Sequence, residues 1–184
     1  MQKKMAQYTY QTWPGILVLG LTLFLTACGQ KSDEDATTPA AAKPLDSIQL
    51  LDTRPTGALA VKAAREQLKP GDEAVVYGQI GGADEPFFAG YAGFVLGDTA
   101  ILFCDEMGDD HCASPWDACC EDPDKLKASR ASVQFVDAEG LPLETSLKGQ
   151  PGLEPLRKIT VTGKVAAASS PENLIIEARG FYLE

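Results

Sequence analysis

Four cysteines in one short segment are the residues of this sequence best suited to chemistry. Cys104, Cys112, Cys119 and Cys120 follow the spacing C-x7-C-x6-C-C, and the only histidine of the chain, His111, precedes Cys112. Cysteines grouped in this way pair as disulfides, hold a soft metal ion or take part in redox exchange. The segment, residues 104–122, therefore predicts a loop with one of these three roles.

In the first interpretation, two disulfides fix the loop. Adjacent cysteines rarely bond each other because the geometry is strained, so Cys119 and Cys120 should each pair with Cys104 or Cys112. The sequence does not choose between the two crossings. An exported protein meets an oxidising compartment, where such bonds persist. The bridges would stabilise the domain by about 2–4 kcal/mol each.

In the second interpretation, the four thiolates, or three of them with His111, bind zinc or another thiophilic metal ion. The spacing is not that of a standard structural zinc site, which uses closely spaced cysteine pairs. Acidic residues crowd the same segment and would raise the local concentration of cations. They are Asp105, Glu106, Asp109, Asp110, Asp117, Glu121 and Asp122.

A redox-active cysteine pair is the third interpretation. Reactive cysteines need a lowered pKa, which cationic neighbours or a helix N-terminus supply, whereas this segment is strongly acidic. The chain also has no nucleophile elbow, phosphate-binding glycine loop or HExxH zinc motif. We therefore expect a protein that is not an enzyme and has no catalytic residue; zinc is its cofactor only in the second interpretation.

The elements that position this loop are mostly strands. One short helix is expected before them, with Thr56 as its N-cap and Val61, Ala64 and Leu68 on its buried face. After Gly71, apolar alternation and turn residues predict a series of strands. The expected strands are 74–80, 91–96, 100–104, 132–136, 143–147, 158–165 and 173–183, with hairpin turns at 97–98 and 137–140.

The strand pattern resembles an OB-fold. Residues 158–165 (KITVTGKV) and 173–183 (NLIIEARGFYL) are similar to the last two strands of such barrels, and VVYGQI and YAGFVLGD are similar to the opening strands. The resemblance implies a mainly β protein: a small antiparallel barrel with one short helix before it and the cysteine-rich loop inserted. A β-sandwich is the alternative.

The first 27 residues resemble the signal peptide of a bacterial lipoprotein precursor. Lys3 and Lys4 precede an apolar run too short to span a bilayer, and Leu25-Thr26-Ala27-Cys28 is similar to a lipobox. The resemblance implies cleavage before Cys28 and lipidation of its thiol and amine, with palmitate among the chains. The cysteine segment is also similar to one in an uncharacterised family of bacterial lipoproteins.

These features predict an envelope protein held to the membrane through Cys28. By the same resemblance, Gly29 favours the outer membrane, with the protein facing the periplasm. Residues 28–50 include a polar stretch rich in Ala, Thr and Pro, which predicts a lipidated, disordered tether. Residues 51–184 would then form the OB-like domain.

The charge of the chain excludes one class of partner. Its 16 Lys and Arg residues are outnumbered by 26 Asp and Glu residues, which gives a net charge of −10. Nucleic-acid binding depends on Lys and Arg neutralising phosphates, so no nucleic-acid partner is expected. The expected function is a non-enzymatic binding or structural module; the alternative is a metal-binding or thiol-redox envelope protein. The sequence does not identify a protein or small-molecule partner.

Overall fold

The computed structural model describes residues 44–108 and 112–184 of the chain. Contacts divide the chain into residues Met1–Thr37 and Thr38–Glu184, and every described residue belongs to the second unit. The expected signal peptide and Cys28 lie outside the described residues, as does most of the expected tether. No helix among the described residues is both long and apolar enough to cross a membrane.

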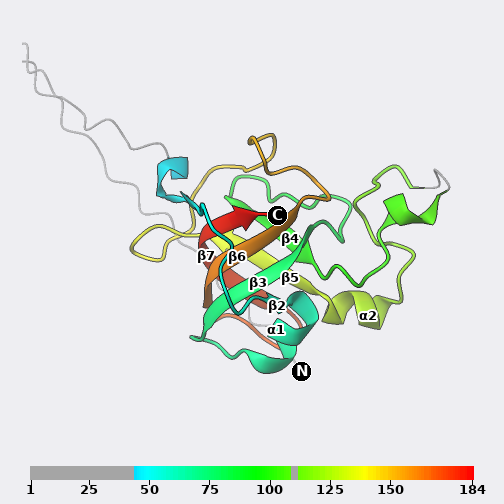
Figure 1. The fold of residues 1–184 in the computed structure, drawn as a ribbon, viewed down its shortest axis with the longest axis horizontal. Coiled ribbons are helices and arrows are strands. Elements are labelled where there is room, and N and C mark those ends of the chain that lie inside the picture. Colours follow the sequence, from blue (N-terminus) through cyan, green and yellow to red (C-terminus); the bar gives the residue numbers. More distant parts are fainter. Residues whose placement is uncertain (1–43, 109–111) are drawn as a thin grey trace, which may run out of the picture. The chain divides into compact units, whose positions relative to one another are not determined.

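Five strands of this unit close into a barrel. Each strand is hydrogen-bonded to two others in the ring order β3-β4-β5-β7-β6-β3. In Figure 1 these strands cross the centre of the picture. They are β3 (Glu73–Ile80), β4 (Gly93–Gly97), β5 (Arg130–Phe135), β6 (Lys158–Val165) and β7 (Leu174–Leu183).

This ring confirms the predicted fold class, a small OB-like barrel. Neighbouring strands run antiparallel except β5 and β7, which are parallel. A closed ring leaves no second sheet to face the first, so the β-sandwich alternative is wrong. The cysteine-rich loop is inserted between β4 and β5, as a connection between neighbouring strands of the barrel.

Alternation along the strands fills the barrel with apolar side chains. Ile159, Val161 and Val165 of β6 are buried, as their spacing predicted. Rings from other elements then pack across the interior: the centroids of Phe94 and Phe135 are 6.1 Å apart, and those of Phe135 and Phe181 are 6.0 Å apart. These separations are typical of aromatic pairs, so one continuous core supports the barrel.

Short elements at the N-terminal side extend the packed region. They are the 3-10 helix η1 (Pro44–Ser47), the strands β1 (Gln49–Leu50) and β2 (Leu59–Ala60), and the helix α1 (Val61–Gln67). Strand β1 pairs with β7, with Gln49 opposite Gly180, and β2 pairs with β3. The packed part of the chain therefore begins before residue 51, where the sequence placed its boundary.

Helix α1 begins later than the sequence predicted, and its N-cap is not Thr56. The helix starts at Val61, and the side chain of Ala60, the N-cap residue, makes no capping hydrogen bond. Asp98, which follows β4, supplies the acceptor instead: its Oδ2 accepts from the backbone N–H of Lys62 at 2.8 Å, and its Oδ1 accepts from that of Ala100 at 2.9 Å. A carboxylate at a helix N-terminus satisfies free amides and the helix dipole.

Replacing Asp98 with alanine should lower the free energy of unfolding by about 2 kcal/mol, because two backbone amides lose their acceptor at a buried site. Chemical denaturation followed by circular dichroism measures this change. Asp72→Ala is the matched control, since it removes an exposed hydrogen bond to the amide of Lys69. Equal losses in the two variants would contradict a special role for Asp98.

Two expected strands do not form. Residues 100–104 do not pair with β4, because Asp98 turns the chain and Cys104 begins the 3-10 helix η2 (Cys104–Met107). Residues 143–147 form no strand either; only Val136 and Pro142 make an isolated bridge at that hairpin. Leu143 and Leu147 pack into the barrel core instead. In both places several of the apolar side chains are buried, although the backbone that carries them is irregular.

A second helix, α2 (Pro123–Ala128), was not predicted from the sequence. Asp122 caps it by accepting a hydrogen bond from the backbone N–H of Lys125 at 2.9 Å, and Pro123 occupies its first position. Both are standard helix-start signals. The helix ends the cysteine-rich loop and leads the chain back to β5.

Candidate metal centre

The cysteine-rich loop has a small apolar core of its own. Ile101, Phe103 and Ala118 are almost completely buried together, with Leu126 of α2 and Leu156 packed against them. This cluster is distinct from the core of the barrel. It fixes residues on both sides of the loop, so the cysteines that flank it have defined positions.

Backbone hydrogen bonds join the two arms of the loop. The N–H of Cys104 donates to the carbonyl of Asp117 at 2.8 Å, and the N–H of Asp105 donates to that of Pro115 at 2.9 Å. Cys104 on the first arm is thereby placed opposite the segment that leads to Cys119. The pairing explains how residues 15 positions apart in the sequence come together.

A second set of contacts holds the loop on the barrel. The N–H of Gly82, just after β3, donates to the carbonyl of Trp116 at 2.8 Å. The indole N–H of Trp116 donates to the carbonyl of Asp84 at 2.7 Å, and the hydroxyl of Ser114 donates to the carboxylate of Asp84. A Cβ on Gly81 would lie 2.6 Å from the carbonyl oxygen of Trp116, so glycine permits this close approach.

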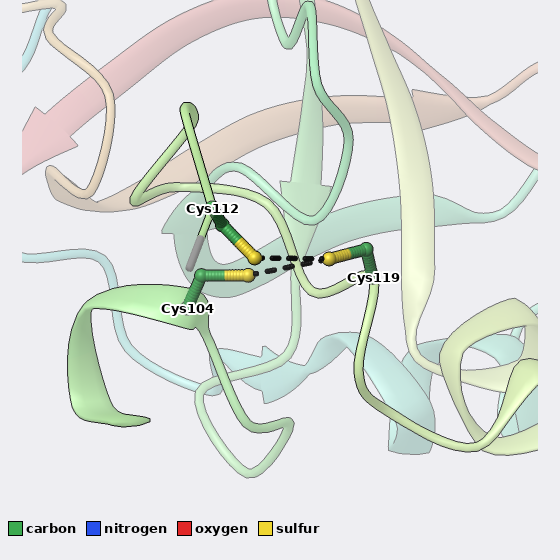
Figure 2. A group of neighbouring side chains, drawn as sticks. All are labelled: Cys104, Cys112 and Cys119. Atoms are coloured by element: carbon green, nitrogen blue, oxygen red, sulfur yellow. Dashed lines mark hydrogen bonds between the residues drawn. The ribbon is translucent and has the colours of Figure 1, made fainter. Parts of the chain in front are cut away.

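Three sulfur atoms converge at the centre of the loop. The Sγ of Cys119 lies 3.3 Å from that of Cys112 and 3.6 Å from that of Cys104, and all three lie within 4.8 Å of one another. Figure 2 shows Cys104 and Cys112 on one side, with their sulfurs directed at the sulfur of Cys119 on the other. The geometry thus selects three of the four predicted cysteines.

The separations distinguish between bonded and coordinated sulfur. A disulfide requires about 2.05 Å between sulfurs, and no pair approaches that value; all four cysteines are free. Zinc–sulfur bonds of about 2.3 Å in a tetrahedral site place the sulfurs about 3.8 Å apart. The observed 3.3 and 3.6 Å are much closer to the second value. Two of the three sulfur separations are therefore close to those of thiolate ligands around one ion.

Cys120 lies beside this group without belonging to it. The N–H of Glu121 donates to the carbonyl of Ala118 at 3.0 Å, which closes a turn with Cys119 and Cys120 at its two central positions. The turn brings the sulfurs of the two adjacent residues to 3.9 Å. The first interpretation paired Cys119 and Cys120 each with Cys104 or Cys112. In the structure Cys119 lies near both of those residues, and Cys120 is not a member of the three-sulfur group.

Exposure differs strongly among the four thiols. Cys104 is 7% exposed, Cys112 is half-buried, and Cys119 and Cys120 are exposed. Hydrogen bonds with the thiols of Cys119 and Cys104 raise the pKa of Cys112 to about 12. A thiol with so high a pKa is a poor nucleophile at neutral pH.

Glu121 ties the end of the loop to its beginning. Its Oε2 accepts from the backbone N–H of Leu102 at 3.0 Å and from Lys125 Nζ at 2.5 Å, and its Oε1 accepts from the N–H of Asp122 at 3.0 Å. The hydrogen bond with Lys125 and those with the two amides lower the pKa of this carboxyl to about 2. Glu121 is therefore ionised and already accepts hydrogen bonds from three donors.

A hollow lies elsewhere in the described part of the chain, beside α1 and α2. Its volume is about 620 Å³, and Arg65, Lys127 and Glu172 are among the residues lining it. Arg65 donates to the carbonyls of Arg130 and Pro171, and Lys127 pairs with Glu172. Arg65 and Lys127, two of the cations that line the hollow, therefore already have partners.

The remaining sequence predictions for the site involve residues outside the described part. His111, the candidate fourth ligand, and Cys28, the candidate lipidation site, belong there. Sequence reasoning missed Gly82 and Asp84, which anchor the loop. No local signal in the sequence links Gly82 to Trp116.

The fold and the site together define a small OB-like barrel that carries a three-thiol loop. Comparisons of the chain with protein families, with curated proteins and with solved structures find no match.

Proposed function

We propose that this protein binds a thiophilic metal ion, zinc or one of similar chemistry, through Cys104, Cys112 and Cys119. It does so as a non-enzymatic module at the surface of the cell envelope. The observation that carries the proposal is the convergence of three sulfurs at separations close to those of thiolate ligands around one ion. Metal binding would organise the loop or store the ion, without chemical conversion of a substrate.

The way the loop is built supports this function. Its two arms are joined by backbone hydrogen bonds, and its apolar cluster and its contacts with Gly82 and Asp84 fix it on the barrel. Ligands that are held in place before binding cost little conformational entropy when the ion arrives. The acidic side chains around the loop add a favourable field for a cation.

The location is part of the proposal and comes from the sequence. The Leu25-Thr26-Ala27-Cys28 motif after an apolar run supports lipidation of Cys28, and Gly29 supports placement in the outer membrane, facing the periplasm. More than one acyl chain is needed for stable anchoring, which a lipidated cysteine with a modified amine would provide. The barrel would then be displayed at the membrane surface, without nucleic acid as a partner.

The direct test is metal binding by the reduced full chain carrying Cys28→Ser, which leaves the four loop cysteines as its only thiols. We expect one equivalent of zinc by native mass spectrometry. Loss of a residue that only supports a metal ligand weakens binding by up to about 100-fold. Replacing a direct ligand, Cys104, Cys112 or Cys119, with serine should therefore weaken zinc binding by more than that. Competition with a chromophoric chelator measures the affinities.

Ala113→Ser is the matched control, because it adds a hydroxyl next to Cys112 at an exposed position and removes no thiol. Its affinity should equal that of the parent chain. Circular dichroism of each cysteine variant checks that the barrel is folded. A folded parent chain that binds no zinc or other thiophilic ion in the reduced state would refute the proposed function.

A disulfide-stapled structural module is the second candidate. It is favoured by the 3.3 Å approach of the Cys112 and Cys119 sulfurs, the shortest in the loop. A small change of side-chain torsions would bring this pair toward bonding distance. In that case the exported protein would show alkylation-resistant cysteines and no metal, and reduction would lower its melting temperature.

A further inference from the structure

We propose that Cys120 is a relay ligand through which the metal ion enters and leaves the three-sulfur site. This inference depends on the proposed function of Cys104, Cys112 and Cys119 as resident ligands. It assigns a separate, kinetic role to the fourth thiol. Cys120 would control how fast the ion exchanges, whereas the other three thiols determine how tightly it is held.

The turn at Ala118–Glu121 supplies the geometric basis. Adjacent side chains in an extended strand point to opposite faces, but here the sulfurs of Cys119 and Cys120 lie 3.9 Å apart. That separation is about the distance between two thiolates on one tetrahedral ion. An ion could therefore be held by both sulfurs at once during transfer, although Cys120 is outside the resident group.

Exposure gives the direction of the path. Cys104 is buried at the inner side of the site, Cys112 is half-buried, and Cys119 and Cys120 are exposed. An ion arriving from solvent meets the exposed pair first. The inner thiols can then replace water or the Cys120 sulfur as ligands, so the ion moves inward in one step of ligand exchange.

The exchange balances without a redox reagent. On entry, the Cys120 thiol releases its proton to water and forms a bond to the ion. The bond between Cys120 and the ion then breaks and the Cys120 sulfur takes a proton back from water, as a resident thiol loses its proton to solvent and binds. On release, Cys120 loses its proton and binds again while a resident bond breaks, and each sulfur that the acceptor displaces takes up a proton from water. No oxidation state changes.

Neighbouring groups do not offer an alternative relay. Glu121 accepts from two backbone amides and Lys125, and Asp122 caps α2 through its contact with the N–H of Lys125. Moving either carboxylate onto an ion would break hydrogen bonds that hold the loop together. Within the described part of the loop, the Cys120 sulfur contacts the Cys119 sulfur and joins none of the hydrogen bonds that hold the two arms together.

The test separates rate from affinity. The reduced full chain with Cys28→Ser is loaded with zinc, and transfer to an excess of chromophoric chelator is followed by stopped-flow absorbance. Adding Cys120→Ser should slow transfer about tenfold, a modest increase in barrier, and should change the equilibrium affinity by less than about threefold. Ala113→Ser, the matched control, should leave both quantities unchanged.

Each result supports or overturns the assignment. A slower transfer at constant affinity supports the relay. Unchanged rate and affinity would overturn it, and so would a large loss of affinity, which would make Cys120 a resident ligand. In both of those cases zinc still binds the parent chain, so the proposed function survives. If the parent chain binds no zinc, the proposed function fails and the relay fails with it.

Discussion

Gly163→Ala is expected to lower the free energy of unfolding by about 3 kcal/mol or more, the upper range for overpacking a tightly packed site. A Cβ at this position would lie 2.2 Å from the carbonyl oxygen of Glu177 and 2.8 Å from the Cα of Ala178. Both atoms belong to the backbone of β7, which cannot move away without disturbing the barrel. The melting temperature should fall by roughly 10 °C.

The reason lies in how β6 and β7 pair. Their register shifts between Thr162 and Gly163, where the strands approach closely and the sheet bends. Glycine commonly occupies such bends. Substitution by alanine usually stabilises a protein by about 0.4–1 kcal/mol through the unfolded chain, but the contact with the β7 backbone is expected to outweigh that gain.

Gly140→Ala is the matched control for this prediction. Gly140 has a φ of +84° and open space around its Cβ position, so alanine there adds only the cost of a left-handed backbone, about 1–2 kcal/mol. Thermal unfolding followed by circular dichroism compares the two variants. If Gly163→Ala were no more damaging than Gly140→Ala, the close packing of β6 on β7 would not be limiting for stability.

The regular part of the barrel could be predicted because its signals are local. The alternation in Lys158–Val165 defines a strand with the same bounds in the structure. Strand β7 differs from its expected range by one residue at its start. In such segments, every second side chain faces the core, and the sequence records that directly.

The two wrong strands failed for a shared physical reason. Ile101 and Phe103 are apolar and spaced like strand residues, yet they pack against Ala118 across the loop. Leu143 and Leu147 likewise join the barrel core from irregular backbone. Apolar alternation cannot distinguish a strand from a loop whose packing partners lie far away in the sequence.

The site illustrates the same limit. Composition was enough to nominate the four cysteines, but not to separate three of them from the fourth. That separation depends on the hydrogen bonds of Cys104 and Asp105 with the opposite arm and on the turn that contains Cys119 and Cys120. The docking of Trp116 on Gly82 and Asp84 is equally non-local. Such contacts arise only when the barrel has formed.

Cys28→Ser is expected to move the protein from the membrane fraction to the soluble fraction or to leave it as an unprocessed precursor. The physical reason is that stable attachment needs at least two lipid chains, and the serine hydroxyl cannot form the thioether on which such a modification depends. Fractionation shows the location, and intact mass shows whether acyl chains are present. Cys120→Ser is the matched control, since it also removes one thiol but should leave lipidation unchanged.

A second substitution tests the membrane to which the protein is sorted. By the resemblance to Gram-negative lipoproteins, Gly29→Asp should retain the lipidated protein at the inner membrane. Its intact mass should still include lipid, and on a sucrose gradient it should move to the density of the inner-membrane fraction. If Cys28→Ser still fractionates with membranes at the processed wild-type mass, the anchor is not on Cys28. In that case the three-thiol site would remain testable on its own, because Cys104, Cys112 and Cys119 meet within the loop wherever the protein is located.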